Sequence, residues 1–236
     1  MMQTILVLNS KGGCGKTTLA TNLTSLYATG GVKTALMDYD PQGSSAQWHQ
    51  LRAEELAQIH LINAACKTSR GQTRSWQLAV PQGTERLIID APAGVTGNLL
   101  RELLGRADIV LIPVAPSPID IHATSDFIKD LLLVGKIRSL GVYAGVIANR
   151  VRRETPLYDP LRRFLNSLRI PLITSLTDTE NYVRAAEFGK GIYELPEAET
   201  ALEREQWLPL IRWLACPEAP SRTPQDLPRL SLVSGA

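Results

Sequence analysis

Short apolar runs recur along the first 150 residues of the chain, and segments of helix length separate them. The runs lack the alternation that is typical of a half-exposed strand, so they predict buried strands at residues 4–8, 33–37, 86–89, 109–114 and 143–148. Buried strands separated by helices indicate an α/β fold, in which a mostly parallel, twisted sheet carries helices on both faces. The loops after the strands then share one sheet edge, where ligands bind in such folds.

The length and composition predict one folded domain. The chain has 236 residues, of which 44% are hydrophobic and 20% charged, as in ordinary globular proteins. We expect the domain to span residues 1–215 and to end in a helix over 200–215, which has apolar positions at helical spacing. Residues 216–236 carry four prolines in a polar stretch, which predicts a flexible tail.

Charge and cysteine content exclude several classes of protein. Lys and Arg exceed Asp and Glu by 25 to 23, so the chain is not grossly basic, although a local basic patch is compatible with these numbers. No apolar run is long enough for a membrane span and the start lacks a basic signal region, so we expect a cytoplasmic protein. The three cysteines are widely scattered, which favours reduced thiols over a metal or iron–sulfur site.

A glycine-rich loop between the first strand and a helical segment is the most specific motif. It reads Asn9-Ser10-Lys11-Gly12-Gly13-Cys14-Gly15-Lys16-Thr17-Thr18. Glycines let the loop's backbone N–H groups surround phosphates, and the helix that begins near Lys16 adds its positive end. This context predicts a nucleoside triphosphate with Lys16 on the β- and γ-phosphates, Thr17 on Mg²⁺ and Thr18 on the α-phosphate.

Lys11 makes the loop unusual, because two cations in one phosphate site require a strongly anionic ligand. The pattern Lys-Gly-Gly-x-Gly-Lys-Thr resembles the deviant Walker motif of the ParA/MinD ATPases, relatives of the nitrogenase iron protein. The resemblance implies that the chain binds ATP, with Gly12, Gly13, Cys14 and Gly15 in the phosphate loop. It also implies an ATP-sandwich homodimer in which Lys11 reaches the partner's nucleotide.

Carboxylates follow two further strands at the same predicted edge. Asp38 and Asp40 lie in Asp-Tyr-Asp-Pro-Gln, which is similar to the family's switch I and implies that Asp40 polarises the attacking water while Asp38 supports the Mg²⁺ shell. Taken alone, the stretch also suits a turn followed by a helix cap. Asp90 ends an apolar run, as a Walker B acid must to reach Mg²⁺ through water, and Ala93 replaces the second proline of the family's switch II.

Asn149 ends the last predicted strand, where its amide suits either the adenine edge or a strand-terminating cap. The pair Asn149-Arg150 is similar to the family's strand-ending Asn-Arg, which favours the adenine role. The late stretch 182–191 also looks like the family's late helix. The resemblance therefore covers residues 4–195, about four-fifths of the chain.

Six arginines between residues 150 and 169 predict a surface for DNA phosphates. The alternative is a solvated helix face paired with Glu154 and Asp159. ParA-like proteins bind nucleoid DNA without sequence preference when loaded with ATP, and this resemblance favours DNA. The candidate DNA-binding residues are Arg152, Arg153, Arg162, Arg163 and Arg184.

The chain is most similar in type to the short ParA proteins, because no helix-turn-helix precedes residue 4. The resemblance implies a nucleoid-associated ATP hydrolase, slow on its own, that positions a plasmid, carboxysome or other large cargo with an adaptor protein that stimulates hydrolysis. A MinD-like ATPase that cycles on membranes is an alternative, although the end of the chain lacks a basic amphipathic helix. A non-hydrolysing nucleotide-dependent scaffold is another, but it leaves Asp40 and Asp90 without a task.

Overall fold

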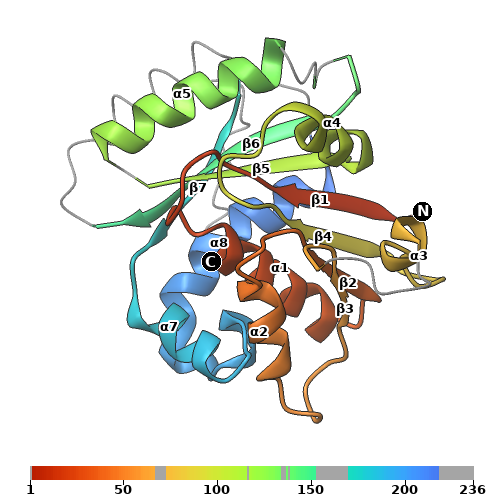
Figure 1. Cartoon of the computed structure of the whole chain (residues 1–236). Helices are drawn as coiled ribbons and strands as arrows, with labels where there is room; N and C mark the ends of the chain where they lie inside the picture. Colours follow the sequence, from red (N-terminus) through yellow and green to blue (C-terminus); the bar gives the residue numbers. More distant parts are fainter. Residues whose placement is uncertain are drawn as a thin grey trace, which may run out of the picture.

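The computed structural model describes residues 2–66, 73–115, 117–133, 137, 139–152 and 170–217. Its centre is a seven-stranded sheet in the order β3-β2-β4-β1-β5-β6-β7, and every strand pair in it is parallel (Figure 1). The strands are β1 (Gln3–Val7), β2 (Thr34–Asp38), β3 (His60–Asn63), β4 (Arg86–Asp90), β5 (Ile109–Val114), β6 (Tyr143–Val151) and β7 (Leu172–Thr177). The predicted α/β fold is confirmed.

Helices cover both faces of the sheet, α4 and α5 on one and α1, α2, α7 and α8 on the other (Figure 1). Their bounds are α1 (Lys16–Thr29), α2 (Ser44–Gln50), α3 (Arg74–Gln77), α4 (Gly97–Arg106), α5 (Pro118–Leu133), α7 (Glu180–Glu187) and α8 (Glu197–Ala215), with a 3₁₀ turn η1 (Ile192–Glu194). This three-layer arrangement buries the sheet on both sides, which is why its strands read as continuous apolar runs.

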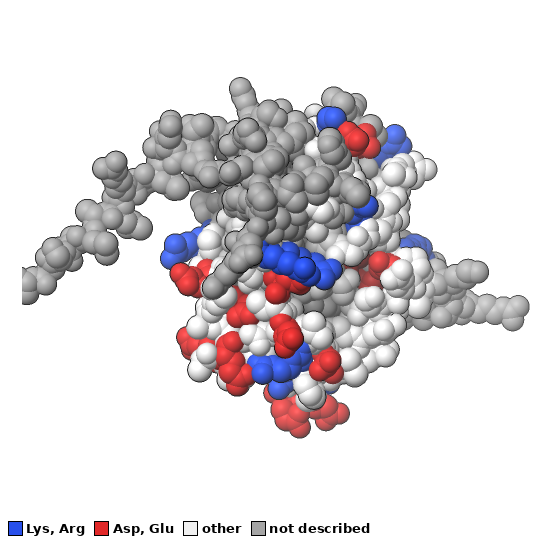
Figure 2. Space-filling model, turned by 90° about the vertical axis from the view of Figure 1, so that its left-hand side faces the viewer, with Lys and Arg blue, Asp and Glu red and all other residues white. Residues whose placement is uncertain are grey.

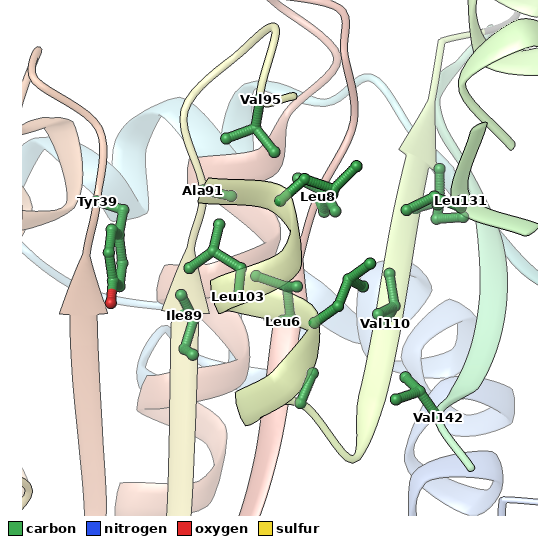
Figure 3. Packing of buried hydrophobic residues seen from close by; sticks show 14 of the residues in the cluster. Leu6, Leu8, Tyr39, Ile89, Ala91, Val95, Leu103, Val110, Leu131 and Val142 are labelled. Atoms are coloured by element: carbon green, nitrogen blue, oxygen red, sulfur yellow. The ribbon is translucent and has the colours of Figure 1, made fainter. Parts of the chain in front are cut away.

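Two apolar cores result from the alternation of side chains along the strands. Leu6 of β1 and Ile89 of β4 face the core beneath α4 and α5, where Leu103 is buried against them (Figure 3). Their neighbours Ile5 and Ile88 point to the opposite core, beneath α1 and α8. Because successive residues of a strand face opposite sides, one apolar run supplies both cores.

All five predicted strands are present, with ends that shift by three residues at most. β3 and β7 were not predicted. Both are edge strands; β3 has four residues, and β7 alternates between buried and partly exposed positions. The last helix starts earlier than predicted, at Glu197, and continues through Pro209 to Ala215. The predicted tail lies outside the described residues from 218 onward, so the domain boundary stays a prediction.

A buried ion pair joins the end of α2 to η1, and hydrogen bonds join it to the segment before η1. Arg52, just after α2, donates to Glu194 Oε1 at 2.7 Å and to the Gly189 carbonyl at 2.8 Å, and its side chain is 6% exposed. The indole of Trp48 on α2 lies under the Arg52 guanidinium and donates to the Lys190 carbonyl at 3.1 Å. Segments about 140 residues apart are therefore fixed to each other.

Gly189 permits this contact, and replacing it with alanine should destabilise the fold. Its φ is +60°, and a Cβ there would lie 2.5 Å from the Arg52 backbone nitrogen. We expect Gly189→Ala to lower the free energy of unfolding by about 2–4 kcal/mol, because left-handed strain and a backbone clash add. Gly141→Ala is the matched control, since Gly141 has φ +69° and open space around it, and should lose only about 1–2 kcal/mol in urea denaturation. Equal losses in the two variants would contradict the packing argument.

Candidate functional site

The glycine-rich loop lies between β1 and the start of α1, and two of its glycines have left-handed backbone. Gly13 has φ +75° and Gly15, the residue before α1, has φ +89°. Asn149 at the end of β6 donates from Nδ2 to the Cys14 carbonyl at 2.9 Å. A Cβ on Gly15 would lie 2.0 Å from that same nitrogen, so glycine is required there. Asn149, near the end of β6, thus holds the backbone of the glycine-rich loop in place.

The loop is held in place by its own polar side chains and by Lys16. Asn9 is buried, accepts from the Lys11 backbone N–H at 3.3 Å and donates to the Pro113 carbonyl at 2.7 Å. The Lys16 ammonium is buried and donates to the Lys11 carbonyl at 2.8 Å. The lysine predicted to bind phosphate therefore lies against the loop whose N–H groups would share that phosphate.

Asp38 and Asp90 are neighbours across β2 and β4, and both are buried. Asp38 accepts backbone N–H bonds from Asp40 and Ala46, each at 2.9 Å. Asp90 Oδ2 accepts from the Thr17 hydroxyl at 2.8 Å and from the Ser45 hydroxyl. The site thus joins the phosphate loop, the Asp40 loop and the end of β4 through two carboxylates.

Burial raises the pKa of both acids, because removal from water disfavours the charged form. For Asp90 the pKa rises to about 7, with burial as the largest cause. The hydrogen bonds from Ser45 and Thr17 oppose this rise in part. The negative charge of Asp38 also raises the pKa, and the positive charge of Lys16 lowers it. For Asp38 burial also raises the pKa, against the bonds from Ala46 and Asp40. An acid perturbed in this way beside a lysine and a threonine is typical of a functional site.

These residues fit a bound Mg²⁺. Asp90 Oδ1 is buried and has no hydrogen-bond partner among the described residues, which leaves an oxygen for a metal-bound water. Asp90 does not line the cavity above it, whereas Thr17, held by Asp90, does. Bound Mg²⁺ usually keeps several of its waters and is held by one or two protein groups together with the substrate phosphates. One hydroxyl and one carboxylate that acts through water are compatible with this coordination. The described residues hold no cluster of three or more His, Cys, Asp or Glu side chains suited to a metal.

Asp40 lies at the mouth of the site, partly exposed, and lines the cavity. Its carboxylate accepts from the Gln42 backbone N–H at 2.9 Å, and its carbonyl accepts from Gly43. The turn that the sequence allowed as an alternative is therefore present. It places the carboxylate beside the phosphate loop, so the turn and the predicted role toward water are compatible.

A cavity of about 630 Å³ opens over the phosphate loop. It brings together most of the residues predicted for nucleotide binding, namely Gly12, Gly13, Gly15, Lys16, Thr17, Thr18, Asp40 and Asn149, whereas the predicted Cys14 is buried and does not line it. Its far wall was not predicted and comes from β7 and α7, with Thr177, Asp178, Thr179, Tyr182, Val183, Ala186 and Glu187. The polar run Asp178-Thr179 directly after β7 is the sequence signal that would have located this wall.

Arg150 also lines the cavity and has an unusual backbone. Its φ of +58° is left-handed, which is rare for a residue with a side chain. The guanidinium donates to Asp178 Oδ1 at 3.2 Å and approaches the Gly13 carbonyl at 3.4 Å. Strained backbone of this kind often lies at functional sites, and here it directs the side chain from β6 toward the phosphate loop.

The candidate DNA-binding arginines lie in different surroundings. Arg152 is 81% exposed and lies 3.7 Å from Asp178. Arg184 pairs with Glu199, and the exposed Glu180 and Glu187 share its helix. Figure 2 shows acidic side chains intermixed with basic ones on the side of the molecule that lies to the left in Figure 1. Arg153, Arg162 and Arg163 lie outside the described residues.

The comparisons with known proteins agree with this site. The family model for the CobQ/CobB/MinD/ParA nucleotide-binding domain matches residues 5–192, a range that includes the phosphate loop, both acidic loops and the far wall. The chain belongs to this family. The predicted resemblance to the ParA/MinD ATPases is confirmed.

A relative within the ParA/MinD family aligns with most of this chain. Maintenance of carboxysome distribution protein A of Halothiobacillus neapolitanus is 27% identical over 194 residues, which cover 81% of this chain and 87% of that protein.

Solved structures of the family share the fold. The ATP complex of Cyanothece McdA has 19% identity and a TM-score of 0.66, covering 89% of this chain and 96% of that one. The Mg-ADP complex of the septum site-determining protein MinD of Pyrococcus horikoshii has 16% identity and a TM-score of 0.64, covering 94% and 100%.

Two further observations concern the predicted class of protein. All three cysteines are described, and none forms a disulfide, as predicted. Within the described part of the chain, every helix falls short of the length and apolarity that a bilayer crossing requires.

Replacing Asp90 with asparagine should stabilise this ParA/MinD-family chain in the absence of nucleotide. The pKa of Asp90 lies above its ordinary value of 3.8, so the charged acid costs stability as the pH rises from about 4 to 7, and the cost is complete above 7. We expect Asp90→Asn to raise the free energy of unfolding at pH 8 by about 1–3 kcal/mol, after allowing for a buried amide N–H that lacks a partner. The gain should shrink as the pH falls toward 4.

Urea denaturation at pH 8 and pH 5 measures this difference. Asp126→Asn is the control, because Asp126 is 77% exposed, and it should change stability little at either pH. If Asp90→Asn were less stable than wild type at pH 8, the buried charge of Asp90 would not carry the proposed cost in free energy of unfolding.

Proposed function

We propose that the chain is a ParA-type ATPase that dimerises on ATP, binds DNA without sequence preference and positions a large cargo with an adaptor protein. The observation that carries the proposal is the junction at one cavity of Lys16, Thr17 and Asp40 with the buried Asp90 behind them. The likeness to a carboxysome distribution protein over 81% of the chain supports a carboxysome or a comparable assembly as cargo.

The residues around the cavity suit ATP hydrolysis. The loop N–H groups and Lys16 bind the phosphates, and Asp40 orients a water against the terminal one. Mg²⁺ supplies positive charge to the phosphates when bound, with Thr17 as its ligand and Asp90 in contact through water. The remaining wall, from Asn149 to α7, is left for the base and sugar. Arg150 is already paired with Asp178, so we expect slow hydrolysis until an adaptor acts.

A dimer follows from the charge of the ligand and the position of Lys11. Lys16 lies inside its own loop, bonded to the carbonyl of Lys11, whereas the residue Lys11 is partly exposed beside the cavity. Two triphosphates placed face to face carry more negative charge than one loop neutralises, so a second lysine from each partner stabilises the pair. The homodimer therefore accounts for both lysines of the motif.

DNA binding rests on the region from Arg150 to residue 169. Among the candidates within the described chain, the Arg152 side chain is 81% exposed and lies 3.7 Å from Asp178, whereas the Arg184 side chain is 44% exposed, pairs with Glu199 and shares its helix with Glu180 and Glu187. Phosphate contacts need exposed cations, and dimerisation doubles their number on one particle. We therefore assign non-specific duplex binding to Arg152 and its sequence neighbours, and a nucleoid-associated location in the cytoplasm follows from it.

Lys16 and Lys11 should have separable effects. Lys16→Ala is expected to abolish ATP binding in isothermal titration, because the phosphates lose their main cation. Lys11→Ala should bind ATP but fail to dimerise in sedimentation velocity, whereas Asp40→Ala should bind ATP and accumulate as a dimer. Lys33→Ala, at an exposed lysine before β2, is the control and should behave as wild type. A Lys11→Ala protein that dimerises normally would remove the role of Lys11 across the interface.

Arg152→Glu should weaken DNA binding equally for unrelated duplexes in the presence of ATP. The affinity should fall by a similar factor for every duplex. The slope of log affinity against log salt concentration should become shallower by about 1 to 2, since each lost phosphate contact releases one counterion fewer. Arg101→Glu, on α4, is the matched control and should have little effect. Fluorescence anisotropy with ATP or ADP measures the affinity. Retention on anionic liposomes without binding to DNA would instead support the MinD-like alternative.

A further inference from the structure

Ser45 lies at the second position of α2, fully buried, and its hydroxyl donates to Asp90 Oδ2. Thr17 donates to the same oxygen at 2.8 Å. The neighbouring residue Ala46 donates its backbone N–H to Asp38 Oδ2 at 2.9 Å. The first turn of α2 is therefore bonded to both buried carboxylates of the sheet edge.

The direction of the Ser45 hydroxyl differs from that of other buried hydroxyls in the same layer. Thr21, Thr24 and Ser25 of α1 donate to carbonyls of their own helix. A buried serine satisfies its hydroxyl locally in that way without any function. Ser45 instead bonds across to β4, to a carboxylate, which makes the stronger kind of hydrogen bond.

The consequence is a chain of contacts that leads to the cavity. Asp90 does not reach the cavity, but Thr17, at the other side of the same oxygen, lines it. Because Ser45 and Thr17 share Oδ2, the position of the Asp90 carboxylate is fixed between α1 and α2, and Oδ1 is left without a described partner. The Asp40 loop continues directly into α2, so the same bond ties that loop to β4.

We infer that Ser45 is a positioning residue for the Mg²⁺ side of the nucleotide site, acting through Asp90 on Thr17. This inference rests on the proposed function, since it assumes a nucleotide with Mg²⁺ in the cavity. Ser45 holds Oδ2 in place, so that the Thr17 hydroxyl keeps its orientation and Oδ1 is available to a metal-bound water. Loss of the hydroxyl lets the carboxylate turn and weakens the preference of the site for the metal-bound nucleotide.

The test compares the affinity for a fluorescent ATP analogue with Mg²⁺ present and with EDTA. In wild type the affinity with Mg²⁺ is expected to be higher, and the ratio of the two affinities reports the metal side of the site. Ser45→Ala should lower that ratio roughly tenfold, the usual cost of removing a side chain that hydrogen-bonds a metal-binding residue. The affinity in EDTA should not change. Ser45→Thr retains the hydroxyl and should restore most of the ratio.

Ser25→Ala is the matched control, because among the described residues this buried serine hydroxyl bonds only its own helix. It should leave the ratio at the wild-type value even if it lowers stability. A Ser45→Ala protein with the wild-type ratio, including one in which both affinities fall together, overturns the inference while the proposed function stands. A wild-type protein that binds the analogue equally with Mg²⁺ and EDTA, or fails to bind it, overturns the proposed function itself.

Discussion

The burial of two carboxylates side by side at the edge of the sheet is the constraint on which the site depends. Asp38 and Asp90 are register neighbours, and both are buried. Buried like charges are costly unless each oxygen is hydrogen-bonded or neutralised. Backbone N–H groups satisfy Asp38, and hydroxyls from α1 and α2 satisfy one oxygen of Asp90. The phosphate loop, the Asp40 loop and the end of β4 are thereby fixed around the two carboxylates. A cation bound there would neutralise their negative charge.

The short helix α2 extends this constraint to the other side of the cavity. Its first turn is bonded to the carboxylates, and at its far end Trp48 and Arg52 bond the segment between α7 and η1. The cavity wall formed by α7 precedes that segment directly. The phosphate side and the opposite wall are thus connected through the seven residues of α2 and a buried ion pair, rather than through a flexible loop.

The sequence predicted what depends on local pattern and missed what depends on distant contacts. Continuous apolar runs identified the five central strands, because burial on both faces removes polar alternation. The edge strands β3 and β7 lack that signal, and with β7 the wall at Asp178 was missed. The loop motif located Lys16 and Thr17 directly. The bond between Ser45 and Asp90 joins residues 45 positions apart, and no local pattern encodes it.

Charge shows the same limit of sequence reasoning. Arg152 and Arg184 are the same type of residue, but folding leaves the Arg152 side chain 81% exposed beside Asp178, whereas it places Arg184 against Glu199 with Glu180 and Glu187 on the same helix. A phosphate approaching Arg184 would meet those carboxylates within a Debye length, so their repulsion weakens the attraction of Arg184. With a net charge of only +2, a single copy of the chain offers polyanions little long-range attraction. If two copies pair on nucleotide as proposed, two sets of exposed arginines come together on one particle, and the proposed dimerisation would then strengthen the proposed DNA binding.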